Sequence, residues 1–237
     1  MLELSPNRLR AVSDAYRFLS LFLSLPDEET AEGVVSGDAA ADLESILREM
    51  GVEPCECKSV AAIMDEDIAE SPECVRTELR RDFTRLFTNP EKPLVGIYEA
   101  SFKDAGDFDT SKLAFVSPTA IDAEKRYRAW GLAMGQAHRE SCDHMGAEVD
   151  FLAYLYAVWA EAVEAQQAAE AERAREAIVG FMDAHFLKWA DPFFEAVGRN
   201  ARTASYRAVG ALGVLVAREG QRQRQAESPV ELEGEGW

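Results

Sequence analysis

The chain has 237 residues, 47% of them hydrophobic and 29% charged, which is the composition of a folded globular protein. Its 43 acidic and 25 basic residues leave a net charge of −18, which argues against binding nucleic-acid phosphates or docking on an anionic membrane. No apolar run approaches the roughly 18–20 residues that span a bilayer, and four cysteines are too few for a disulfide framework, so we expect a cytoplasmic protein.

Helix signals dominate the first part of the chain. Ser5-Pro6 places a capping residue before a proline at the first helical position, and apolar residues then recur at spacings of three and four until Pro26. A second cap-and-proline pair, Ser71-Pro72, begins a helix that we expect to end near Phe87. Two shorter helices are expected between these, at 38–50 and 58–70.

The helical periodicity fails between Thr88 and about Ser117. Prolines and glycines interrupt this stretch, at Pro90, Pro93, Gly96 and Gly106. A loop of this length inside a compact domain is usually functional or mobile. We therefore expect a hinge or binding loop at 88–117.

Helical patterns resume at Ser117-Pro118, which predicts a helix to about Arg139, and again at Asp143. The stretch 160–176 contains no helix breaker, so either one long helix crosses it or a turn lies near 167–172. Further helices are expected at 178–187, from Asp191-Pro192, and from Thr203 or Ser205. With no alternating strand pattern, the sequence predicts one all-α domain at 1–219 and a disordered tail at 220–237.

The histidines offer few candidate chemical sites. His144 and Glu148 lie four residues apart, with Asp143 at the helix entrance, so these three could form a metal site or an acid–base pair. A zinc site needs three or four ligands, and spacing alone favours Asp143 as the helix cap. The stripe of His185, Trp189 and Phe193 is more typical of a packed core than of a cofactor site.

Three segments in a fixed order carry a resemblance to a known family. They are Phe83-Thr-Arg-Leu-Phe87 with Pro90, Pro93 and Tyr98-Glu-Ala-Ser-Phe102; Cys142-Asp-His-Met-Gly-Ala-Glu148 with Phe151; and Phe181-Met-Asp-Ala-His185 with Trp189. Together the segments resemble the TorD/DmsD/NarJ family of molybdoenzyme maturation chaperones. Asn89, Ala100 and Cys142 depart from the usual glycine, serine and proline of the family.

The resemblance implies an all-α bundle, a monomer or a domain-swapped dimer, and a chaperone that is not an enzyme and needs no cofactor or metal. Its expected partners are the twin-arginine leader and the apo form of a molybdopterin oxidoreductase catalytic subunit, held for cofactor insertion before export. The alternative is a metal-dependent hydrolase that uses Asp143, His144 and Glu148. Metal analysis of the purified protein would separate these two hypotheses.

A receptor for a twin-arginine leader needs carboxylates for the guanidinium groups and an apolar groove for the hydrophobic stretch. The motif segments can supply both. The residues that we expect to bind the leader are Leu86, Phe87, Tyr98, Glu99, Asp143, His144, Glu148 and Phe151.

Overall fold

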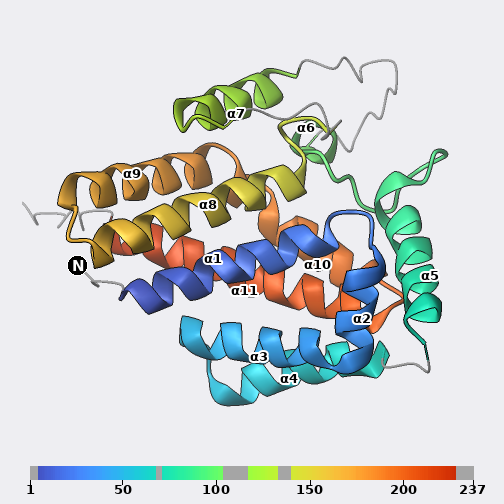
Figure 1. Cartoon of the computed structure of the whole chain (residues 1–237). Coiled ribbons are helices and arrows are strands. Elements are labelled where there is room, and N and C mark those ends of the chain that lie inside the picture. The colour runs from blue at the N-terminus through green and yellow to red at the C-terminus, as the bar shows by residue number, and fades with distance from the viewer. Residues whose placement is uncertain (1–4, 68–70, 104–116, 133–139, 228–237) are drawn as a thin grey trace, which may run out of the picture.

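A computed structural model describes residues 5–67, 71–103, 117–132 and 140–227 (Figure 1). Across these ranges the secondary structure is helical, apart from one isolated bridge between Tyr98 and His144. The predicted all-α fold is therefore confirmed. No helix within the described ranges is both long enough and apolar enough to cross a membrane.

Eleven α-helices are described, and three short turns of other helix types join them. The α-helices are α1 (Pro6–Phe22), α2 (Glu28–Ser36), α3 (Asp38–Met50), α4 (Pro54–Met64), α5 (Pro72–Phe83), α6 (Glu99–Lys103), α7 (Pro118–Ala129), α8 (Met145–Glu164), α9 (Ala168–Ala184), α10 (Ala190–Asn200) and α11 (Ala204–Glu227). A π-helical turn at Thr84–Thr88 extends α5, and 3-10 turns lie at Asp65–Asp67 and Phe186–Lys188.

The centre of the bundle is formed by α1, α8 and α11, with α10 crossing α11 and α9 lying along α8 (Figure 1). The helices α3 and α4 form a second pair beside α1 and α11, and α7 lies outside α8 and α9. Aromatic rings fill much of the interior. The largest fully buried side chains include Trp189, Tyr16, Tyr156 and Tyr206.

The cap-and-proline pairs begin helices as the sequence predicts. The hydroxyls of Ser5, Ser71 and Ser117 accept hydrogen bonds from the backbone N–H of the third residue that follows each. Each hydroxyl satisfies one of the donors that the first turn of a helix leaves unpaired. These three helix starts could therefore be placed from local sequence alone.

Several predicted helix boundaries are wrong. The helix expected at 58–70 begins at Pro54 and ends at Met64. The helix after Ser117 ends at Ala129 rather than near Arg139, because the chain turns at Gly131, whose φ of 72° is in the left-handed region. Residues 133–139 lie outside the described part. The helix α2 was not expected; Asp27 caps it by accepting from the N–H of Thr30.

The stretch 160–176 contains a turn and not one long helix, because α8 ends at Glu164 and α9 begins at Ala168. The sequence predicts that a disordered tail begins at residue 220. In the structure, residues 220–227 instead continue α11. Glutamine and arginine are good helix formers, and Gln223 and Arg224 contact Tyr156 and Asp183. Residues 228–237 lie outside the described ranges.

The stretch 88–117 is only partly irregular. Val95 and Ile97 are buried in the core, and α6 begins at Glu99. Residues 104–116 lie outside the described ranges, so a hinge in this stretch stays a prediction.

Candidate functional site

Two motif segments that lie far apart in the sequence meet as an antiparallel pair at the start of α8. The N–H of Met145 donates to the carbonyl of Ile97 at 2.9 Å, and the N–H of Glu99 donates to the carbonyl of Asp143 at 2.8 Å. This pairing places Tyr98 opposite His144. The tyrosine motif and the Asp-His motif therefore form one site.

The side chain of Asp143 joins the starts of two helices. One of its oxygens accepts from the N–H of Ala100 in α6 at 3.2 Å and from the hydroxyl of Ser117, the cap of α7, at 3.4 Å. Only 3% of Asp143 is exposed. Asp143 therefore positions α6 and α7. The spacing had suggested that Asp143 caps α8, and this prediction is wrong.

The cap of α8 is His144. Its Nδ1 accepts from the N–H of Gly146 at 3.0 Å, which requires that this nitrogen is unprotonated. Burial lowers the pKa of His144, although the negative charges of Glu140 and Asp143 oppose this effect. The structure thus favours the neutral imidazole at the helix entrance.

Tyr98 is the most accessible of the predicted binding residues. Its ring meets the ring of His144 edge to face, with centroids 5.2 Å apart, and its hydroxyl donates to the carboxylate of Glu140. Burial, followed by the bond to Glu140, raises the pKa of Tyr98. Glu140 itself is exposed. Sequence reasoning missed Glu140, because it lies outside the recognised motif and has no periodic signal of its own.

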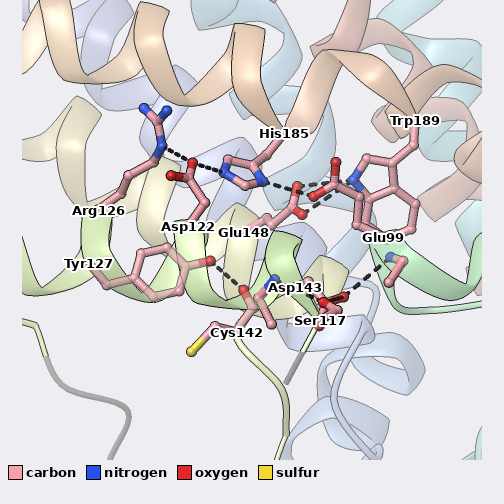
Figure 2. Close-up of polar contacts among 12 residues, drawn as sticks. Glu99, Ser117, Asp122, Arg126, Tyr127, Cys142, Asp143, Glu148, His185 and Trp189 are labelled. Atoms are coloured by element: carbon pink, nitrogen blue, oxygen red, sulfur yellow. Dashed lines mark hydrogen bonds and ion pairs between the residues drawn. The ribbon is translucent and has the colours of Figure 1, made fainter. Parts of the chain in front are cut away.

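A partly buried polar cluster connects α6, α7 and the end of α9 (Figure 2). His185, at the end of α9, contacts Glu99 through Nδ1 at 2.8 Å and Asp122 of α7 through Nε2 at 3.0 Å. Two carboxylates can be satisfied together only by an imidazole that holds both ring protons, or by one carboxyl that carries a proton. Asp122 in turn pairs with Arg126 at 2.8 Å. The cluster therefore ties α6, α7 and α9 together.

The cluster extends to α8 and α10 through a third carboxylate, that of Glu148. Trp189, which precedes α10, donates its indole N–H to Glu148, and both side chains are fully buried. The burial of Trp189 confirms its predicted place in the core. Phe102 of α6 also packs on this indole, with centroids 5.5 Å apart.

The grouping of potential metal ligands differs from the predicted one. Glu99, Glu148 and His185 each offer a ligand atom, and these atoms lie within 4.8 Å of one another. Among the described residues, Asp143 and His144 do not join Glu148 in such a group. The hydrolase site is therefore not formed, because Asp143 bonds α6 and α7 while the Nδ1 of His144 is used as a cap.

The other predicted binding residues lie in the interior. Leu86, Phe87 and Phe151 are 0%, 4% and 3% exposed, and Glu99 and Glu148 are fully buried. The ring of Phe87 stacks on Phe193 at 6.1 Å, and the ring of Phe151 meets that of Phe181 at 4.9 Å. In this conformation these side chains pack the core, so their direct contact with a peptide stays a prediction.

Two exposed leucines flank a residue at the end of α1 that lies beside the start of α8. Leu23, near the end of α1, comes within 3.6 Å of the position that a side chain would occupy at Gly146, so the end of α1 lies beside the start of α8. Its neighbours Leu21 and Leu25 are 47% and 56% exposed. The end of the bundle that holds Tyr98 therefore offers an exposed carboxylate, an aromatic ring and apolar side chains.

A second polar network anchors the start of α11 and was also missed from sequence. Asp82 accepts from the N–H groups of Arg202 and Thr203 and from the hydroxyl of Thr203, and it pairs with Arg85. Only 2% of Asp82 is exposed. Asp82 directly precedes the first motif segment and lies three residues before Arg85, and that spacing was the available signal.

A family model described as "Nitrate reductase delta subunit" matches residues 54–195, well over half of the chain. A solved structure of a candidate redox enzyme maturation protein from Archaeoglobus fulgidus is 16% identical, with a TM-score of 0.46 over 90% of this chain and 93% of that chain. No curated protein matches the chain significantly.

Proposed function

Because the chain belongs to the nitrate reductase delta subunit family, we propose that it is a maturation chaperone for a redox enzyme. Its client is the catalytic subunit of an exported molybdoenzyme. The chaperone binds the twin-arginine leader of this subunit and holds the apo form until its cofactor is inserted. The protein acts by binding and needs no cofactor of its own.

The observation that carries this proposal is the pair formed by Tyr98 and Glu140 at the end of the bundle. Arginine forms bidentate hydrogen bonds with carboxylates and stacks on aromatic faces, so an exposed Glu140 beside the ring of Tyr98 suits a guanidinium group. Leu21 and Leu25 are exposed apolar side chains for the hydrophobic part of a leader. A net charge of −18 would attract the cationic leader over a distance.

The buried residues of the motifs support this surface from beneath. Asp143 holds the start of α6, which directly follows Tyr98, and His144 supports the ring of Tyr98. Direct contact of a leader with Glu99, Glu148, Leu86, Phe87 or Phe151 would require that the packing around these buried side chains opens. The leader therefore makes its first contact with Tyr98 and Glu140.

Co-purification of a client subunit tests the proposal. The apo catalytic subunit of a molybdoenzyme encoded nearby is expressed with its own leader, with both leader arginines changed to lysine, and with the leader deleted. We expect capture of the first form and strongly reduced capture of the other two. Equal capture of all three would show that the protein recognises the folded client surface instead of the leader.

A further inference from the structure

Three buried side chains offer ligand atoms from three separate helices. Glu99 is the first residue of α6, Glu148 lies in the first turn of α8, and His185 follows the last residue of α9. Their ligand atoms lie within 4.8 Å of one another, and the three residues are 0%, 0% and 2% exposed. Figure 2 shows the three side chains directed toward one another. Over the described ranges, no other group of histidine, cysteine and acidic side chains converges in this way.

The chemistry of this ligand set favours a transition metal. Zinc binds imidazole nitrogen and carboxylate oxygen at about 2.0–2.2 Å, whereas magnesium and calcium prefer oxygen ligands alone. At these bond lengths, two ligand atoms of a tetrahedral zinc ion are about 3.4 Å apart. No pair of atoms in the group exceeds that separation by more than about 1.4 Å. The group therefore suits Zn²⁺ or a similar first-row divalent ion.

The groups around the ligands are those that orient a metal site. A histidine that binds a metal usually donates its other ring N–H to a carboxylate, which fixes the orientation of the ring. His185 has this arrangement, because its Nδ1 faces Glu99 at 2.8 Å while its Nε2 contacts Asp122 at 3.0 Å. The indole N–H of Trp189 donates to Glu148 and orients that carboxylate. A carboxylate has about four acceptor sites, so this bond leaves Glu148 able to bind an ion.

We propose that Glu99, Glu148 and His185 bind one Zn²⁺ or similar divalent ion. The ion takes the place of the proton between His185 Nδ1 and Glu99, and that proton leaves to solvent, because metal ligands must be deprotonated. The side chain of Asp122 is 48% exposed, so the cluster lies one side chain away from solvent and an ion can enter there. Because the ligands themselves are buried, the ion has a structural role and joins α6, α8 and the end of α9. This site does not depend on the leader proposal.

Zinc binding to the full-length protein, measured by competition with a chromophoric chelator in excess Mg²⁺, tests the proposal. We expect one zinc ion per chain. Glu99→Gln and Glu148→Gln retain the shape of the side chain and a carbonyl acceptor but lose the charge, so each should bind zinc at least roughly tenfold more weakly. Glu164→Gln makes the same change in charge at a side chain of α8 that is 62% exposed, and it should bind as the wild type does. No zinc binding by the wild type, or equal binding by Glu99→Gln, would overturn the proposal.

Two further variants locate the ion without removing a ligand. Asp122→Asn removes the carboxylate behind His185 and should weaken zinc binding roughly 10–100-fold. His144→Asn lies outside the group and should retain zinc, so a loss in this variant with normal binding in Glu99→Gln would place the ion elsewhere and overturn the proposal. Circular dichroism shows whether each metal-free variant is folded. Zinc should also raise the unfolding temperature of the wild type, because an ion that binds only the folded state stabilises it. An unchanged temperature would contradict the structural role.

Discussion

Trp189 donates its indole N–H to both carboxylate oxygens of Glu148, at 3.1 Å and 3.3 Å, and neither side chain is exposed. The bond connects the aromatic core at the α9–α10 junction to the first turn of α8, four residues after the cap His144. The buried core therefore reaches the start of α8, where His144 supports the ring of Tyr98. The contributions of the core and of the proposed leader surface can be separated by substitution.

Replacement of Trp189 should reduce stability and leave leader binding intact. Trp189→Ala removes a fully buried ring and should cost about 3–5 kcal/mol of unfolding free energy. Trp189→Phe keeps much of the packing but removes the donor to Glu148, so we expect a loss of about 1–3 kcal/mol. Urea unfolding measures both, with the half-buried Trp159→Phe as control. Normal stability with lost leader binding would place Trp189 in the leader site instead.

The cap of α8 should make stability depend on pH. Burial lowers the pKa of His144 in the folded state below its ordinary value of 6.5. Between these two pKa values only the unfolded state binds the proton, so stability rises with pH across this window and is lost on acidification. The hydrogen bond that Nδ1 accepts from the N–H of Gly146 also requires the neutral imidazole.

This dependence is measured by urea unfolding at pH values on both sides of 6.5, with His144→Asn as the matched variant. Asparagine also caps helices but does not titrate in this range. The variant should show a smaller loss of stability on acidification than the wild type. An identical pH dependence of the two proteins would exclude His144 as the titrating group.

Asp143 should act on leader binding through α6 and α7. Asp143→Ala removes the acceptor of the Ala100 N–H and the Ser117 hydroxyl, which should cost about 1–3 kcal/mol and speed hydrogen exchange at the starts of both helices. Asp143→Asn retains a carbonyl acceptor, so its effect on exchange and on leader affinity should be smaller. If both variants fold with unchanged exchange at α6, Asp143 does not position that helix.

Asp82, unlike Asp143, should affect stability alone, because its hydrogen bonds anchor the start of α11 and do not involve Tyr98. Removal of its carboxylate leaves two backbone N–H groups without their acceptor, and Arg85 keeps only its bond to the carbonyl of Asn200. Asp82→Ala should therefore cost about 3–5 kcal/mol, as expected when one partner of a buried pair is removed. Leader affinity of the folded molecules should not change. Arg81→Ala, at an exposed neighbouring position, is the control for thermal unfolding.

Local signals in the sequence account for much of the fold. The serine–proline pairs at Ser5, Ser71 and Ser117 begin helices because their hydroxyls cap the first turn wherever the chain lies. The end of α7 was missed because Gly131 carries no periodic signal, and α11 was cut short because polarity was taken to mean disorder.

The candidate site depends on contacts between distant segments, and these are harder to read. The motifs identified Tyr98 and His144, but Glu140 becomes part of the site only through pairing with the Tyr98 hydroxyl. Apolar spacing cannot distinguish a side chain that faces the core from one that faces a binding groove. Leu86, Phe87 and Phe151 were expected to bind the leader, and the structure buries all three. In the same way, the Asp-His spacing suggested a cap at Asp143, whereas the fold directs that side chain to α6 and α7.

Calorimetric titration of a twin-arginine leader peptide into the full-length protein tests leader binding most directly. The leader should bind, and its affinity should fall as salt rises, because exposed ion pairs are screened beyond about 8 Å at physiological ionic strength. Glu140→Gln should weaken binding by roughly tenfold, or about 1.4 kcal/mol. Glu164→Gln, at the other end of α8, should bind as the wild type does. Absence of binding to any leader encoded nearby, or equal binding of a twin-lysine leader, would contradict the proposed function.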